Sequence, residues 1–245
     1  MPVAPKFAST VILYRLQSGT EDSNKCQFEV FLIQRSKKMR FLGGVHAFPG
    51  GKLEDEDIQE KNLARCKGFD KNRAHQMILD KNTFHQHRNY SLGFWITGIR
   101  ELFEEVGILF AYDNKNSLLN LSDPKLQKKF EGYRNKLLEK KMVLSDIMAQ
   151  EDLYYAVDKL HYFRHFITPE LSPIRYDTRF FLAELPPNQT VKPTTTEIIS
   201  SEWAKPSATL KRYRKKEIIL IPPQHSCLSS LRKVADIRDF CKSLY

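Results

Sequence analysis

The chain has 245 residues, of which 41% are hydrophobic, enough for one elaborated domain or a domain with a large insertion. No apolar run approaches the ~18 residues of a membrane-spanning helix. The four cysteines lack CxxC spacing, which argues against a zinc site or a disulfide framework and indicates a reducing compartment. The net charge of +10 suits a polyanionic ligand. The lysines are dispersed, however, so neither nucleic acid nor a membrane is an expected partner.

The N-terminal part begins with two segments typical of neighbouring β-strands. Residues 8–16 and 27–34 are rich in β-branched and aromatic side chains, and a polar turn at 17–24 separates them. A loop that contains glycines follows and ends at Phe48-Pro49-Gly50-Gly51. The paired glycines allow a close approach of the backbone to a ligand.

The next strong pattern is an amphipathic helix that should end at Gly107, a residue suited to a left-handed cap. Four apolar residues form its buried stripe at i, i+3, i+4 and i+7. They are Ile99, Leu102, Phe103 and Val106. Glu101, Glu104 and Glu105 lie on the opposite side, where they repel one another by a few tenths of a kcal/mol per pair. A solvated acidic face and a site for a hard divalent cation both explain these carboxylates.

These two stretches together resemble the box of the Nudix hydrolase family. Gly51 is followed after five residues by Asp57, and Arg100-Glu101-Leu102 continues to Glu104-Glu105 and Gly107-Ile108. The closing nine residues fit the family pattern at every fixed position. Asp57 replaces the usual Glu, and the 42 residues 58–99 stand where the family has seven. The resemblance implies an α/β (α+β) fold, an α/β/α sandwich with a mixed sheet and helical insertions.

The rest of the chain is expected to complete one domain over 1–245, with an insert at 58–99 and a helical insertion at about 122–160. Asp123 or Ser122 can cap a helix with Pro124 at its first position. Leu126, Phe130, Tyr133 and Leu137 form its apolar face. The other expected elements are a strand at 108–111, a helical piece at 144–160, strands at 161–168 and 179–185, a strand near 202–203, a short helix at 206–213, a short strand at 217–221 and a closing helix over 228–240.

The resemblance also implies a reaction and the residues that perform it. Nudix proteins hydrolyse a nucleoside diphosphate linked to another group, with Mg²⁺ or Mn²⁺ as cofactor. Glu101, Glu104 and Glu105 match the family's metal ligands, and the Gly51 carbonyl is an additional candidate. Arg100 is expected to orient the carboxylates. The general base is Glu104, Glu101 or a downstream acid, for which Glu197 is the candidate. The alternative for Glu197 is an exposed loop carboxylate.

The segment before the box resembles the signature of Nudix coenzyme A diphosphatases. Arg35, Ser36, Arg40, Gly44 and 48–51 fall in register with it, whereas Phe31 and Ile33 depart from it. The resemblance implies that CoA or acyl-CoA is the substrate. The implied substrate-binding residues are Arg35, Arg40, Phe48 and Gly50. Arginine suits bidentate binding of phosphate, but Arg35 and Arg40 also fit as surface charges at a strand end.

A longer resemblance, through segments 167–170, 175–181, 202–203 and 221–224, is to the acyl-CoA diphosphatase branch that is peroxisomal in mammals. The chain ends Lys242-Ser243-Leu244-Tyr245 instead of Ser-Lys-Leu, so the cytosol is the expected location, and the peroxisome is the alternative that the resemblance implies. Other diphosphates, such as ADP-ribose, a dinucleotide or a capped RNA, remain alternative substrates. A non-catalytic Nudix-fold binding module is a further alternative, against which the intact carboxylates argue.

Overall fold

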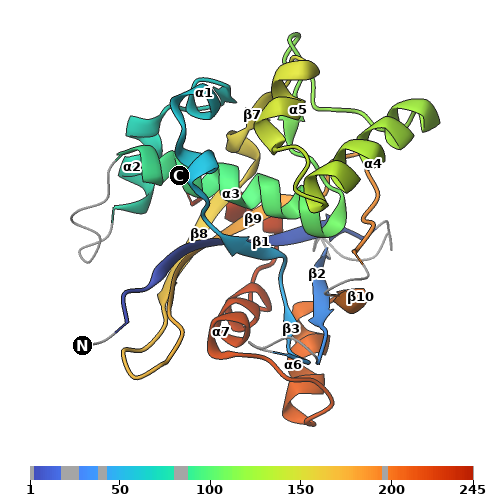
Figure 1. Cartoon of the computed structure of the whole chain (residues 1–245). Helices are drawn as coiled ribbons and strands as arrows, with labels where there is room; N and C mark the ends of the chain where they lie inside the picture. The colour runs from blue at the N-terminus through green and yellow to red at the C-terminus, as the bar shows by residue number, and fades with distance from the viewer. Residues whose placement is uncertain (1–2, 18–27, 38–42, 80–87, 195–197, 245) are drawn as a thin grey trace.

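The computed structural model describes residues 3–17, 28–37, 43–79, 88–194 and 198–244. A seven-stranded mixed sheet lies between two layers of helices, as Figure 1 shows. Its order is β10-β2-β1-β9-β8, with β3 paired to β2 and β4 paired to β1. The pair β1–β9 is parallel, and the other pairs are antiparallel. The strands are β1 (Lys6–Leu16), β2 (Phe28–Arg35), β3 (His46–Ala47), β4 (Gly50–Lys52), β8 (His161–Ile167), β9 (Tyr176–Glu184) and β10 (Ile198–Ala204).

The central strand β1 is apolar on both faces because helices cover both faces of the sheet. Val11 and Leu13 belong to the hydrophobic cluster on the side of helix α3 (Arg88–Val106). Ile12 and Tyr14 belong to the cluster on the other side, together with residues of α6 to α8. This layered arrangement confirms the α/β/α sandwich predicted from the sequence.

Helix α3 has the stripe that its sequence predicts. Ile99, Leu102, Phe103 and Val106 are all at most 1% exposed. The helix ends at Val106, and Gly107 follows with φ of 75°, in the left-handed region that glycine favours. The carboxylate side of the same helix consequently faces away from the sheet's apolar surface, toward β4.

The opposite layer consists of α6 (Pro206–Arg214), α7 (Pro222–Leu231) and α8 (Ile237–Lys242). The expected strand at 217–221 is wrong. That segment makes one backbone bond to β3, from His46 N–H to the Ile219 carbonyl (2.9 Å), and Pro222 then starts a helix because its fixed φ suits the first turn. The expected single closing helix is two helices, since Asp236 caps a new one by accepting from the backbone N–H groups of Arg238 and Asp239.

The insert 58–99 contains α1 (Glu60–Leu63), β5 (Cys66–Lys67), α2 (Lys71–Ile78) and the first turns of α3; it follows a 3₁₀ turn, η1 (Asp55–Ile58). The strand β5 forms a second small sheet with β6 (Ala111–Tyr112) and β7 (Tyr154–Ala156), in the order β5-β7-β6. The insert is therefore tied to the later helical insertion, and both lie on the α3 side of the main sheet (Figure 1).

The helical insertion differs from its prediction in one place, and the strand expected before it differs as well. Helix α4 (Pro124–Leu138) begins as expected, with the Asp123 carboxylate accepting from the Lys125 N–H. The helix predicted over 144–160 is only α5 (Leu144–Gln150), followed by β7 and a 3₁₀ turn, η2 (Val157–Lys159). The strand expected at 108–111 is reduced to β6, because the Gln189 side chain takes both backbone groups of Leu109 that a neighbouring strand would use.

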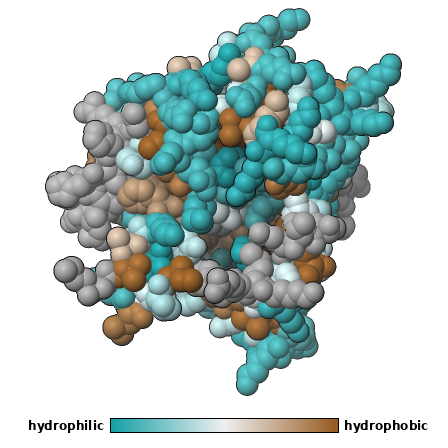
Figure 2. Space-filling model, in the orientation of Figure 1, coloured by the Kyte–Doolittle hydropathy of each residue, from teal (hydrophilic) through white to brown (hydrophobic). Residues whose placement is uncertain are grey.

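The surface seen in Figure 2 is mostly hydrophilic, with separate apolar patches. Across the described residues, none of the helices has the length and apolar character needed to cross a bilayer.

Candidate active site

The two halves of the interrupted box meet in space although 42 residues separate them in sequence. Arg100 from α3 binds Asp57 from η1 through two parallel bonds, Nε to Oδ1 and Nη2 to Oδ2, each 2.9 Å. Nη2 also donates to the Lys52 carbonyl (2.7 Å). Bidentate charge-assisted bonds of this kind are the strong ones. The insert thus extends outward without separating the glycine loop from the acidic helix.

Asp57 is held as firmly as the arginine that it binds. Its side chain is 1% exposed. It also accepts from Thr97 Oγ1 (2.9 Å) and from the Glu54 N–H (3.0 Å). The shorter Asp therefore performs the anchoring of Arg100 from a turn that lies directly against α3, which explains how the departure from the family's Glu is accommodated.

Arg100 reaches the carboxylate side of α3 with its remaining nitrogen. Its Nη1 donates to Glu101 Oε1 (2.8 Å) and to Glu104 Oε1 (3.2 Å). The guanidinium group is buried, so these contacts are little screened by water. The orientation of Glu101 and Glu104 is consequently set by a residue of the same helix, which is itself fixed by Asp57.

The glycine loop packs directly on these carboxylates. A Cβ atom at Gly51 would lie 2.3 Å from Glu101 Oε1, and one at Gly50 would lie 2.3 Å from the Ser9 carbonyl oxygen. The Gly50 N–H donates to Glu105 Oε2 (2.9 Å). Both positions therefore require glycine for close approach. Burial raises the pKa of Glu101 to about 7, with Arg100 opposing the shift and Glu104 adding to it. Burial also raises the pKa of Glu104.

The candidate donor atoms at this end of α3 are carboxylate oxygens of Glu101, Glu104 and Glu105 and the backbone of Gly51. Hard cations such as Mg²⁺ and Mn²⁺ prefer such oxygen ligands. The close approach of the Gly51 backbone to Glu101 also suits a cation that both would bind. Within the described ranges, no three acidic, His or Cys side chains are yet grouped around one point; Arg100 and the Gly50 N–H hold the carboxylates instead. The chemistry of the donors fits a divalent cation.

The residues predicted to bind substrate lie in different parts of the structure. Arg35 ends β2 and is half-buried; its N–H donates to the Val45 carbonyl (3.0 Å). Phe48 is 3% exposed and belongs to the hydrophobic cluster on the α6–α8 side. Its ring packs in the core, and the contact with substrate that the resemblance implies for Phe48 stays a prediction. Arg40 and Glu197 lie outside the described residues.

One arginine that binds the last turn of α3 was not predicted from the sequence. Arg134 of α4 donates to the Glu104 carbonyl from both Nε and Nη2 (3.0 Å each). The signal was present, since Arg134 lies four residues after Phe130 on the apolar face of its helix, where a charged side chain needs a partner. The identity of that partner could not be read from spacing.

The sheet between two helical layers and the Arg100–Glu105 helix packed on a Gly-Gly loop define a Nudix hydrolase domain. The family model of the NUDT19 Nudix domain matches residues 6–231, and the chain belongs to that family. The acyl-coenzyme A diphosphatase NUDT19 of Xenopus laevis is 26% identical over 251 residues, covering 93% of this chain and 66% of the relative. The human protein of the same name is 26% identical over 239 residues, covering 87% and 64%. The chain thus spans slightly less than two thirds of these relatives.

A solved structure has the same fold over nearly the whole chain. The NUDIX hydrolase from Alicyclobacillus acidocaldarius superposes with a TM-score of 0.71 at 21% identity, covering 98% of this chain and 96% of that one. At this identity the likeness establishes the fold, and the chemistry must be argued from the residues.

Proposed function

We propose that this protein hydrolyses the diphosphate bond of coenzyme A or acyl-CoA with the help of Mg²⁺ or Mn²⁺. Water attacks one phosphorus of the diphosphate and the bridging P–O bond breaks, which yields adenosine 3',5'-bisphosphate and (acyl-)4'-phosphopantetheine. The observation that carries the proposal is the assembled contact of Asp57, Arg100, Glu101 and Glu104 beside the glycine loop, in a chain whose relatives bear the name acyl-coenzyme A diphosphatase.

The residues of this site have separate tasks in the proposed reaction. Glu101, Glu104, Glu105 and the Gly51 carbonyl would hold the cation, which when bound neutralises phosphate charge and lowers the pKa of a water molecule. Arg100 holds the carboxylates of Glu101 and Glu104 in place. A carboxylate accepts the proton of the attacking water. Glu104, Glu101 and Glu197 are the proposed candidates for that base.

Substrate recognition is proposed for the loop that precedes the box. Arg35 and Arg40 would contact the phosphates, since a guanidinium group pairs with a phosphate through two parallel bonds. The Gly50 backbone would lie against the diphosphate. CoA carries a 3'-phosphate beside its diphosphate, so two arginines match its charge better than they match ADP-ribose. The +10 net charge supports the same class of anionic substrate.

The test is a product analysis with Mg²⁺ and with Mn²⁺ across CoA, acetyl-CoA, ADP-ribose, NADH and capped RNA. We expect adenosine 3',5'-bisphosphate from CoA or acetyl-CoA, and we expect Glu104→Gln to lower the rate by about 100-fold or more. Glu139→Gln is the matched control, because Glu139 is an exposed glutamate at the end of α4. This control should keep the wild-type rate.

Two results would contradict the proposal at different levels. Turnover of ADP-ribose or capped RNA alone would remove CoA as the substrate while keeping the hydrolase. No turnover of any of the five compounds, together with tight binding of one, would identify a binding module.

A further inference from the structure

The C-terminal end of α3 is held by bonds from other parts of the chain. The last carbonyls of a helix have no partner within it. Here the Glu105 carbonyl accepts from the Thr194 N–H (2.9 Å), and the Val106 carbonyl accepts from the Lys192 N–H (2.7 Å). Arg134 takes the Glu104 carbonyl with two nitrogens. The turn that carries Glu104 and Glu105 is therefore held through its backbone carbonyls, on what we call the back of the helix end.

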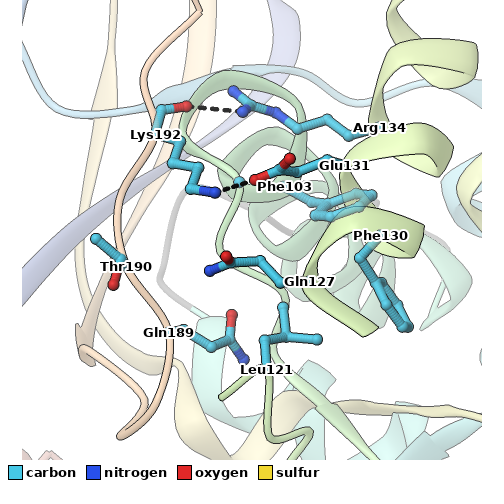
Figure 3. A pocket seen from close by; sticks show the side chains of 10 residues that line it. Phe103, Leu121, Gln127, Phe130, Glu131, Arg134, Gln189, Thr190 and Lys192 are labelled. Carbon is cyan, nitrogen blue, oxygen red and sulfur yellow. Dashed lines mark hydrogen bonds and ion pairs between the residues drawn. The ribbon is translucent and has the colours of Figure 1, made fainter. Parts of the chain in front are cut away.

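Arg134 joins the two elements that hold this end. Its third nitrogen, Nη1, donates to the Lys192 carbonyl (2.7 Å), as Figure 3 shows. The residue is only 9% exposed. Among the described residues no carboxylate accepts a bond from it. Its planar guanidinium group donates instead to backbone oxygens of two segments. Its positive charge also lies where the helix dipole is negative.

The same turn is also held on the side of its carboxylates, which we call the front, by the glycine loop. Glu105 receives the Gly50 N–H on its side chain and the Thr194 N–H on its carbonyl. Arg134 also holds segment 189–194, through the Lys192 carbonyl. One guanidinium group thus restrains both the last turn of α3 and segment 189–194.

We propose that Arg134 is a positioning residue of the active site: by gripping the Glu104 and Lys192 carbonyls it fixes the last turn of α3 and so the geometry in which Glu104 and Glu105 bind a divalent cation. The proposal rests on the proposed function for the identity of the site. It assigns the helical insertion at 122–160 a task in catalysis, because α4 supplies the arginine from outside the Nudix box.

The variants Arg134→Met and Arg134→Lys separate this role from ordinary stability. Methionine keeps the apolar stem, and a small pocket beside Arg134, lined also by Gln127 and Lys192, gives the new side chain room. Lysine keeps the charge, but its single ammonium group lacks the fixed planar donors with which Arg134 binds two carbonyls. Arg65→Met is the matched control. Arg65 also donates to backbone carbonyls, those of Met148 (3.5 Å) and Leu153 (3.2 Å), but far from the carboxylates along the chain.

Two readouts are measured on the full chain: Mn²⁺ binding, from the EPR signal of free Mn²⁺, and kcat and KM for CoA. We expect Arg134→Met to weaken Mn²⁺ binding and to lower kcat, each by about 10–100-fold, with little change in KM. Arg134→Lys should fall between Arg134→Met and the wild type. Arg65→Met should leave Mn²⁺ affinity and kcat unchanged, even where its melting temperature falls.

The inference is overturned if Arg134→Met, or Arg134→Lys should the methionine variant not fold, keeps wild-type Mn²⁺ affinity and kcat. A wild-type protein that binds Mn²⁺ but hydrolyses none of the compounds would instead remove the proposed function. The binding readout would still decide the role of Arg134 in that case.

Discussion

Two buried arginines bind groups at the carboxylate-bearing end of α3, Arg100 from within the helix and Arg134 from α4. Arg100 lies on the front of the helix and donates to three carboxylates, those of Asp57, Glu101 and Glu104. Arg134 lies behind the end of the helix and donates to backbone carbonyls. The front is a network of charges, whereas the back is a network of hydrogen bonds from one charge to the main chain.

Loss of either arginine should therefore have a different consequence. Removal of the front arginine leaves buried carboxylates without a cation, which affects folding as well as chemistry. Removal of the back arginine leaves carbonyl groups that a small side pocket can hydrate, so its main effect should be on geometry.

The largest effect is expected for Arg100→Met. Three carboxylates would lose their shared partner in a buried site, and we expect the metal-free protein to lose about 3–5 kcal/mol of unfolding free energy. Arg238→Met is the control. Arg238 also binds one carboxylate, Glu184, with two nitrogens, but its side chain is 55% exposed. Its loss should be about 0–1 kcal/mol. Equal losses in urea denaturation would show that burial does not distinguish the two.

The stability of the metal-free protein should also depend on pH, through the Glu101 carboxyl group at the front. The pKa of Glu101 is raised to about 7 from 4.5, so between these pH values the folded chain keeps a proton that the unfolded chain releases. The contribution of Glu101 to stability therefore falls as the pH rises from 4.5 to 7. One pKa unit corresponds to about 1.4 kcal/mol, so we expect a fall of about 1–3 kcal/mol.

Glu101→Gln removes that titration, and the difference in unfolding free energy between wild type and variant should change with pH only in this window. The measurement is denaturation at pH 5, 6, 7 and 8 in the presence of a chelator. Parallel pH profiles of the two proteins would contradict the assignment. Added Mn²⁺ should reduce the slope, because a bound cation favours the ionised carboxylate.

Much of the fold could be predicted from the sequence because its patterns are local. The strand β1, the stripe of α3 and the Gly107 stop each depend on residues close in the chain. The errors occur where distant contacts decide. The segment at 108–111 was expected to be a strand, but Gln189, some 80 residues later, binds Leu109. Likewise β7 replaces the end of a predicted helix because it pairs with β5 from the insert.

The same distinction between local and distant contacts applies to the candidate active site. Glu104 lies four residues after Arg100 on one helix, a spacing at which side chains meet, and the family resemblance implied that Arg100 orients the carboxylates. The partnership of Arg100 with Asp57 crosses 43 positions, and it was not predicted from the sequence. Arg134 reaches the Glu104 carbonyl, a backbone atom that every residue possesses. No side-chain pattern can indicate such a partner.

The third prediction concerns the residue that departs from the family pattern. Asp57→Glu would restore the usual acid, yet we expect it to lower the unfolding free energy by about 1–3 kcal/mol. Asp57 is 1% exposed and contacts Thr97 and the Glu54 N–H as well as Arg100, so an added methylene would overpack the site. Asp239→Glu, an exposed exchange on α8, should change stability by less than about 0.5 kcal/mol. A more stable Asp57→Glu protein would show that the insert leaves room for the longer acid.

The smallest effect is expected where front and back meet, at Gly107. Gly107→Ala places a side chain at φ of 75°, which costs about 1–2 kcal/mol, with the new Cβ 3.2 Å from Arg134 Nη1. Gly132→Ala is its opposite, since that position lies on an exposed part of α4 with nothing within 4 Å of the added Cβ; it should stabilise the protein by about 0.5–1 kcal/mol. If Arg134 grips the helix at this turn, Gly107→Ala and Arg134→Met should be non-additive by more than about 0.5 kcal/mol in a double-mutant cycle. Additive losses would mean that the strain at Gly107 is confined to its own backbone and does not reach the arginine behind it.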